Sequence, residues 1–210
     1  MGYHPARSAI IAAWGREEEK LPKRFFQPEE DSTVLEYLLD AVWTVADAIY
    51  IIFSREPSLK LIEAISPFGV KIIIENRNPT IISTILMGFK ASRSEYCLVL
   101  RENTPFLKPS VLHALFEFTK GYDAALPKWA DGRLEPLLAV YRRKSFITVA
   151  SKHQDKDNLL SVLDNLYSVR YVSVEEEIKP LDPELESFFT INSKDDLEKA
   201  KAKITLKYKI

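Results

Sequence analysis

The chain has 210 residues, of which 46% are hydrophobic and 28% charged, as in an ordinary globular protein with a sizeable core. The formal net charge of -1 excludes a general attraction to nucleic acid or to an anionic membrane. The only cysteine, Cys97, rules out an internal disulfide bond, and its apolar neighbours predict a buried thiol rather than a nucleophile. No apolar run approaches the roughly 20 residues of a membrane span, and the N-terminus lacks a signal-peptide pattern. We therefore expect a soluble, cytoplasmic protein.

In the first half of the chain, short apolar runs alternate with helical patterns. The runs at 9–13, 48–53, 70–74 and 97–100 predict buried strands. Helices are expected between them, at 33–46, 57–65 and 78–89. Thr33 and Glu36 form a capping box at the start of the first, and Asn78 is the expected cap of the third. Strands alternating with helices predict a mostly parallel sheet with right-handed crossovers.

The run at 97–100 ends in a polar loop, Arg101-Glu102-Asn103-Thr104, before Pro105. Proline cannot donate to a sheet ladder, so the strand stops here, and a helix is expected from Pro109. Ligands in open α/β sheets bind outside the carboxyl ends of the strands. These four polar residues are therefore the first candidates for a functional site.

The second half of the chain departs from simple alternation. Strands are predicted at 122–126 and 136–141, and the turn Asp131-Gly132 between them indicates an antiparallel excursion. The remaining expected elements are helices at 144–151 and 158–166, a strand at 170–174, and a helix at 197–202 capped by Ser193 and Asp196. No linker or repeat interrupts the pattern, which predicts one domain over 1–210.

Several segments, in order along the chain, resemble the MobA-type molybdenum cofactor guanylyltransferases, which are Rossmann-like nucleotidyltransferases. The segments are 9–15, 22–26, 84–89, 97–107, 131–141 and 189–197. Asp131-Gly132-Arg133 followed by Glu135-Pro136-Leu137 matches closely the family's turn and strand under the acceptor, and the order and spacing of the segments together make the resemblance specific. The resemblance implies a three-layer α/β fold of the nucleotide-diphospho-sugar transferase type. In that fold helices cover both faces of a mostly parallel sheet that contains an antiparallel excursion.

The resemblance also implies an activity, the transfer of a guanylyl group from GTP to molybdopterin with Mg²⁺ and release of pyrophosphate. Asn103 and Glu102 would hold the metal, and Arg133 and Asn192 would bind the acceptor. Lys23 would act with Asn103 in catalysis. The nucleotide would be bound by Ala12, Ala13, Trp14, Gly15, Arg16 and Lys23.

The chain departs from the family pattern where the chemistry should lie. The family's glycine-rich loop here reads Ala12-Ala13-Trp14-Gly15, followed by three glutamates after Arg16. Asn103 stands in place of the family's aspartate, and Mg²⁺ prefers one or two carboxylates. Two alternatives to guanylyl transfer therefore stay open. The protein is a catalytically inactive binding module, or it is a transferase with another nucleotide or acceptor.

Overall fold

The computed structural model describes residues 6–13, 20–22, 31–75, 79–156 and 158–208. Its strands are β1 (Arg7–Ala13), β2 (Lys20–Pro22), β3 (Asp31–Thr33), β4 (Ala48–Phe53), β5 (Lys71–Ile74), β6 (Tyr96–Arg101), β7 (Ala124–Lys128), β8 (Leu138–Arg142) and β9 (Val169–Ser173). Its α-helices are α1 (Val34–Val42), α2 (Leu59–Ile65), α3 (Ile81–Ala91), α4 (Pro109–Phe118), α5 (Arg143–Ala150), α6 (Leu160–Leu163) and α7 (Lys194–Tyr208). Three short turns of other helix types are η1 (Ser66–Phe68), η2 (Val174–Ile178) and η3 (Glu186–Phe188).

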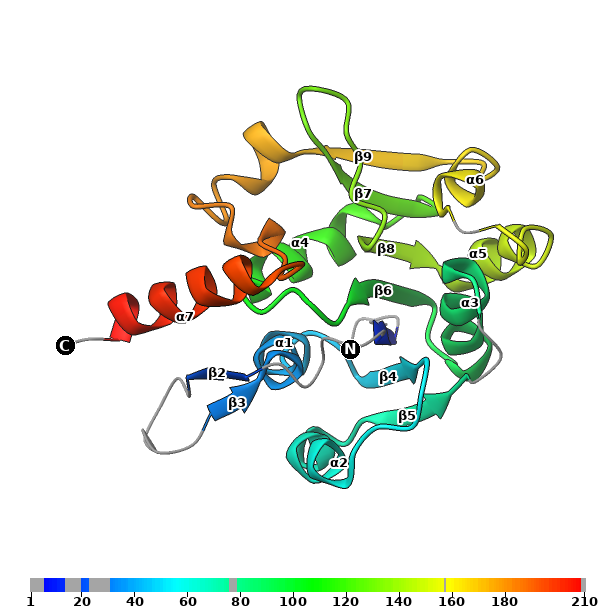
Figure 1. The fold of residues 1–210 in the computed structure, drawn as a ribbon. Helices are drawn as coiled ribbons and strands as arrows, with labels where there is room; N and C mark the ends of the chain where they lie inside the picture. Colours follow the sequence, from blue (N-terminus) through cyan, green and yellow to red (C-terminus); the bar gives the residue numbers. More distant parts are fainter. Residues whose placement is uncertain (1–5, 14–19, 23–30, 76–78, 157, 209–210) are drawn as a thin grey trace, which may run out of the picture.

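A seven-stranded sheet forms the centre of the molecule, in the order β5-β4-β1-β6-β8-β7-β9 (Figure 1). The first four strands in this order are parallel, as predicted, whereas β8 runs antiparallel to both of its neighbours. β7 and β9 are parallel to each other and to β6. All strands of this sheet except β8 therefore end at one edge, which we call the carboxyl edge.

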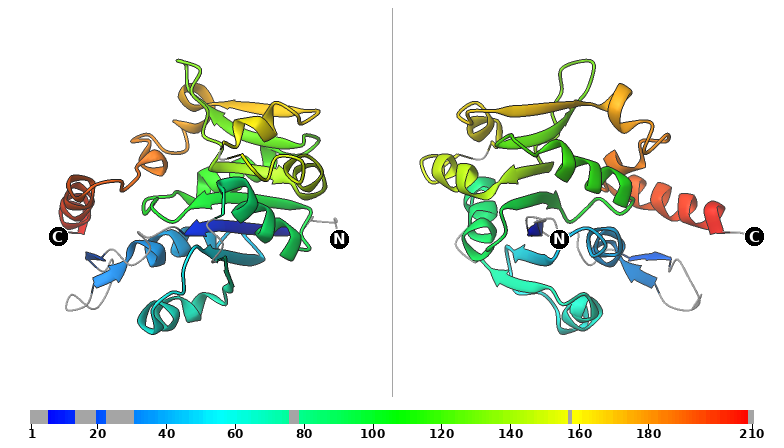
Figure 2. Two further views of the ribbon diagram at one scale, coloured as in Figure 1. Left: turned by 45° about the vertical axis from the view of Figure 1, so that its right-hand side comes forward. Right: turned by 180° about the vertical axis from the view of Figure 1, so that it is seen from behind.

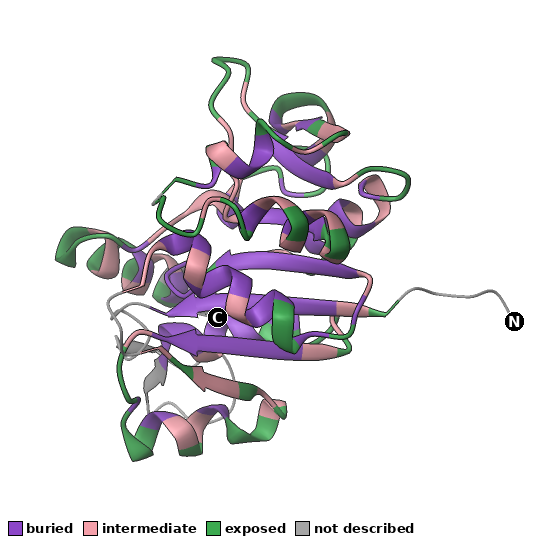
Figure 3. Ribbon diagram, turned by 90° about the vertical axis from the view of Figure 1, so that its right-hand side faces the viewer, coloured by how far each residue is buried: buried purple, intermediate pink, exposed green. Residues whose placement is uncertain are grey.

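Helices cover both faces of this sheet and enclose two hydrophobic cores. One face packs against α1, α2 and α4, and the other against α3, α5 and α6. Figure 3 shows the central strands buried between helices whose outer faces are exposed. The three-layer α/β fold expected from the sequence is confirmed. At the carboxyl edge a third cluster joins α1 and α7 to Phe106 and Ile191.

The helix α7 and the two-stranded ribbon of β2 and β3 project beyond the carboxyl edge (Figure 2). α7 packs against β2, and its Ala200 and Ile204 are buried beside Val34 and Tyr37 of α1. The sequence predicted neither the ribbon nor the full length of α7. Among the described residues, no helix is long and apolar enough to cross a membrane.

Several predicted boundaries were wrong. Thr80 caps α3 by accepting a hydrogen bond from the amide of Ser83, so that helix begins at Ile81; the expected cap, Asn78, lies outside the described residues. α1 ends at Val42, whose carbonyl accepts the amides of Val45 and Ala46 in a turn. The predicted strand at 122–126 begins two residues later, and the predicted helix at 158–166 is confined to α6.

Candidate functional site

The candidate site lies at the carboxyl edge, where the neighbouring strands β1 and β6 end side by side. The chain passes from β1 to β4 on one side, and β6 lies on the other, so the strand order reverses here. Ligands in open α/β sheets bind at such a reversal. Ala12 pairs with Arg101, and the amide of Glu102 donates to the carbonyl of Ala12 at 3.2 Å. The loops that follow both strands therefore leave the sheet at the same place.

The loop after β6 is polar but buried. Glu102 and Asn103 are each 5% exposed, and Thr104 is 7% exposed. The hydroxyl of Thr104 donates to the carbonyl of Arg101 at 3.0 Å and closes the turn that ends the strand. Polar side chains are buried at such depth when they have partners or a function. Arg101, in contrast, is exposed.

Asn103 pairs with the segment just before α7. Its Nδ2 donates to the carbonyl of Ile191 at 3.1 Å and to Oδ1 of Asn192 at 3.0 Å, while the amide of Ile191 donates to the carbonyl of Asn103 at 2.9 Å. A carbonyl accepts only from a donor, so these contacts define which end of the side-chain amide is nitrogen. The structure thus brings together Asn103 and Asn192, two of the predicted site residues.

The same pairing leaves Oδ1 of Asn103 buried without a hydrogen-bond partner in the part of the chain that the structure describes. An amide oxygen can ligate Mg²⁺, and the buried Glu102 is the adjacent carboxylate. No group of three or more His, Cys, Asp or Glu side chains that could hold a metal occurs among the described residues. A metal-binding role for Asn103 and Glu102 stays a prediction.

Asn192 is held in place by the start of α7. Oδ2 of Asp196 accepts the amides of Asn192 and Ser193 at 3.1 and 3.0 Å, and the hydroxyl of Ser193 at 2.8 Å. These hydrogen bonds, that of the Ser193 side chain first, lower the pKa of Asp196. Nδ2 of Asn192 donates to the hydroxyl of Thr190 at 2.8 Å. The predicted Ser193–Asp196 cap thus orients the residue that contacts Asn103.

Arg133 belongs to the hairpin loop between β7 and β8, at the carboxyl edge. Its guanidinium lies 4.5 Å from the ring centroid of Trp129, a cation–π contact. Trp129 also donates to Glu135 at 2.8 Å and packs edge-on against Phe188, 4.9 Å away. The loop between β7 and β8 therefore packs against Phe188, which belongs to the segment that leads to Asn192. A role for Arg133 in acceptor binding stays a prediction.

Several predicted site residues lie outside the described residues: Trp14, Gly15, Arg16 and Lys23. Ala12 and Ala13 form the buried end of β1. Their carbonyls accept the amides of Glu102 and Ser54, so both are engaged in the ladder of the sheet. Nucleotide binding by these six residues remains a prediction.

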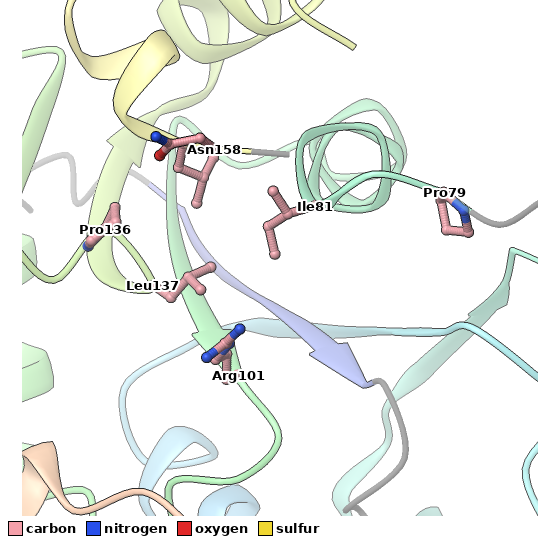
Figure 4. A pocket seen from close by; sticks show the side chains of 7 residues that line it. Pro79, Ile81, Arg101, Pro136, Leu137 and Asn158 are labelled. Atoms are coloured by element: carbon pink, nitrogen blue, oxygen red, sulfur yellow. The ribbon is translucent and has the colours of Figure 1, made fainter. Parts of the chain in front are cut away.

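A cavity of about 430 Å³ opens beside the end of β6. Its lining residues are Pro79, Ile81, Arg101, Pro136, Leu137, Asn158 and Leu159. Figure 4 shows Arg101 at the end of β6, with Ile81, Leu137 and Asn158 around the space above it. The walls are mainly apolar and the polar groups few, as is usual in ligand pockets.

Sequence reasoning found Arg101 only as a member of the polar loop and missed Asn158. The cavity is assembled from β6 and from the starts of α3, β8 and α6, which are far apart in the chain. The one local signal at Asn158 was its place at the start of a predicted helix. That signal indicates a capping residue, and Asn158 does accept the amide of Leu160 at 3.0 Å.

Comparison with known proteins agrees with this architecture. The family model for the MobA-like NTP transferase domain matches residues 17–169. A protein of Methanosarcina acetivorans described as a probable molybdenum cofactor guanylyltransferase is 32% identical over 206 residues, covering 94% of this chain and 91% of its own.

Two solved structures share the fold. Molybdopterin-guanine dinucleotide biosynthesis protein A from Archaeoglobus fulgidus has a TM-score of 0.70 at 23% identity, covering 95% of this chain and 99% of its own. A Mycobacterium tuberculosis protein in complex with manganese has a TM-score of 0.67 at 16% identity, covering 95% and 100%. The family model and the M. acetivorans relative confirm the resemblance seen in the sequence, and the chain belongs to the MobA-like NTP transferase family.

Proposed function

We propose that the protein is a guanylyltransferase that acts on GTP and a phosphorylated acceptor of the molybdopterin type. An oxygen of the acceptor phosphate attacks the α-phosphorus of GTP, a new P–O–P bond forms, and the bond to the β-phosphate breaks to release pyrophosphate. The observation that carries this proposal is the pairing of Asn103 with Asn192 at the carboxyl edge. It brings together two positions that the resemblance implies for the site, with Asn103 where the family has an aspartate, and the named activity of the M. acetivorans relative supports the proposal.

Such a reaction needs positioning and charge stabilisation rather than a covalent intermediate. Mg²⁺ is the proposed metal, held by Oδ1 of Asn103 and by Glu102 together with the nucleotide phosphates. When bound, Mg²⁺ would neutralise negative charge on the attacked phosphate. The manganese complex of the M. tuberculosis neighbour supports a divalent ion in this fold. Lys23 is proposed to bind the phosphates, with the segment from Ala12 to Arg16 around them.

A binding module without catalysis is the second candidate, and Asn103 favours it. The neutral amide leaves Glu102 as the one carboxylate of the polar loop that follows β6. A cation at this site therefore meets less negative charge than an aspartate would provide. A transferase for another nucleotide or acceptor is the third candidate, because the loop Ala12-Ala13-Trp14-Gly15 departs from the family's glycine-rich loop.

Thermal unfolding with GTP, ATP, CTP or UTP, each with and without Mg²⁺, separates these candidates. A ligand that binds only the folded state stabilises it by about 2.7 kcal/mol at a hundred times its Kd. We expect GTP with Mg²⁺ to give the largest rise in Tm. A larger rise with another nucleotide would support the third candidate, and no rise at millimolar concentrations would support the second.

Replacement of Lys23 then tests the proposed phosphate contact. Loss of one charge-assisted hydrogen bond costs about 1.5–3 kcal/mol, so Lys23→Ala should weaken GTP binding roughly 10- to 100-fold in calorimetry. Lys60, an exposed residue of α2, provides the matched control in Lys60→Ala. Equal affinities of the two variants would show that Lys23 is an ordinary surface lysine.

A further inference from the structure

Two segments far apart in the chain lie against each other at the carboxyl edge: the loop that follows β6 and the stretch that precedes α7. At one end, Asn103 and Ile191 exchange two hydrogen bonds. Three residues farther along the loop, the ring centroids of Phe106 and Phe189 lie 5.4 Å apart. The partner's number falls as the loop advances, so the two segments are antiparallel. The position of Asn103 therefore depends on how the far end of this pair of segments is held.

The far end is held by Glu186, a buried carboxylate between two ammonium groups. Glu186 is 7% exposed and forms ion pairs with Lys108, the N-cap residue of α4, and with Lys203 of α7 at 2.9 Å. The amide of Lys108 also donates to the hydroxyl of Ser187 at 3.0 Å. A carboxylate at this depth is stable only where paired charges and hydrogen bonds compensate for its lost hydration. One side chain thus connects the start of α4 to α7.

Lys203 extends this connection to the other side of the proposed site. Its ammonium group lies 5.8 Å from the ring centroid of Phe106, a cation–π contact beside the ion pair. The helix that carries it packs against β2 and against the start of α1. Lys23, the proposed phosphate ligand, directly follows β2 in the sequence. α7 therefore contacts both the ribbon that leads to Lys23 and the loop that begins with Asn103.

We propose that Glu186 and Lys203 are positioning residues for the transfer reaction: their ion pair fixes α7, and α7 sets the spacing between Asn103 and the segment that follows β2. The proposal rests on the proposed function. Glu186 and Lys203 act through these other residues and not by contact with a substrate. Positioning has large effects on a reaction of this kind, because a misplacement of about 1 Å caused by a remote change can cost about 100-fold in rate.

Replacement of Lys203 tests the proposal, because Lys203→Met keeps the apolar stem beside Phe106 and removes the charge. We expect this variant to bind GTP with Mg²⁺ roughly tenfold more weakly in calorimetry, and Lys203→Arg to regain the wild-type affinity. Lys199, whose side chain is 70% exposed one turn earlier in α7, gives the control Lys199→Met. The control loses the same charge and should bind as the wild type does.

Glu186→Gln removes the other partner of the ion pair and should give at least the same loss of affinity. Adding Lys203→Met to it should cost nothing further, because the two changes remove one interaction. A lower urea midpoint of Lys203→Met with unchanged affinity for GTP would overturn the proposal, since the ion pair would then only stabilise the fold. Equal losses in Lys203→Met and Lys199→Met would overturn it too, since the effect would be one of net charge.

Hydrogen exchange without nucleotide separates this proposal from the transferase itself. In Lys203→Met the amides of α7, of the ribbon and of the loop after β6 should exchange roughly tenfold faster, whereas those of β4 should not change. Unchanged exchange in α7 and the ribbon would refute the fixing of α7 by the ion pair. A wild-type protein that binds no nucleotide would refute the transferase, while faster exchange in the variant would still support the fixing of α7.

Discussion

Asn103 and Ile191 form a reciprocal pair across 88 positions of the chain. The amide of Ile191 donates to the carbonyl of Asn103 at 2.9 Å, and Nδ2 of Asn103 donates to the carbonyl of Ile191 at 3.1 Å. The side chain supplies only the donor in this arrangement, because the acceptor is the main-chain carbonyl of Asn103. An aspartate here would have two acceptors, so the pairing with Ile191 and the family's carboxylate are in conflict.

The first prediction follows for Asn103→Asp. The two residues are nearly equal in size, which by itself predicts a neutral exchange, but the geometry contradicts that expectation. A carboxylate oxygen would face the carbonyl of Ile191 and Oδ1 of Asn192, so we expect a loss of about 1–3 kcal/mol of stability without ligand. Because Mg²⁺ prefers a carboxylate, addition of Mg²⁺ with GTP should reduce the deficit.

Urea unfolding with and without Mg²⁺ and GTP measures both effects. Asn165→Asp is the matched control, because Asn165 is exposed and its Nδ2 makes one hydrogen bond, to Ser161, within α6 and its flank. That variant should stay within about 0.5 kcal/mol of the wild type. Equal stability of Asn103→Asp and the control without ligand would show that the pairing with Ile191 contributes little.

A second prediction concerns Gly88, where α3 crosses β1. A Cβ atom added there would lie 2.4 Å from Cγ2 of Ile10 and 3.0 Å from Cδ1 of Ile52. Overpacking of a core typically costs about 1–3 kcal/mol, so Gly88→Ala should lower the urea midpoint accordingly. Ile10→Ala removes the nearest atom, and the double variant should lose less than the sum of the two single losses. Additive losses would mean that the helix shifts to accommodate the methyl group.

Much of the fold was predictable because its signals are local. β1, β4 and β6 are apolar runs, and the Thr33–Glu36 capping box appears in the structure with both of its hydrogen bonds. The ribbon of β2 and β3 was missed because each strand has three residues, too few to show a period. The Thr80 cap was missed because Asn78-Pro79 offered a similar signal two residues earlier.

The candidate site was less predictable, because its parts meet only in three dimensions. Asn103 and Asn192 were each named as site residues through the family resemblance, and no pattern in the intervening residues indicates their contact. The cavity at Arg101 and Asn158 depends on the crossing of α3 and on the antiparallel entry of β8. Sequence periodicity describes single elements, so a space between four of them leaves no trace in it.

A third prediction concerns the thiol of Cys97. The side chain is fully buried in β6, and burial raises its pKa to about 12, so the thiolate that reacts with disulfide reagents is scarce at pH 8. The native protein should not react with Ellman's reagent within the time in which the urea-unfolded protein releases one equivalent. Rapid reaction of the native protein would place the thiol in contact with solvent and exclude the buried strand.

A last prediction links pH to the position of Asn192 through Asp196, whose pKa is lowered by the hydroxyl of Ser193 and then by the amides of Asn192 and Ser193. A carboxyl group with a lowered pKa stabilises the folded state above its unfolded pKa, here near 3.8, and loses that effect as pH falls through the folded value.

Asp196→Ala should therefore lower the urea midpoint at pH 6. The difference from the wild type should shrink as the pH falls below 3.8. Asp195, exposed in the same first turn, gives the control Asp195→Ala, which should leave the urea midpoint at pH 6 close to that of the wild type. A difference that stays constant down to pH 2 would mean that the side chain acts by its size rather than by its charge.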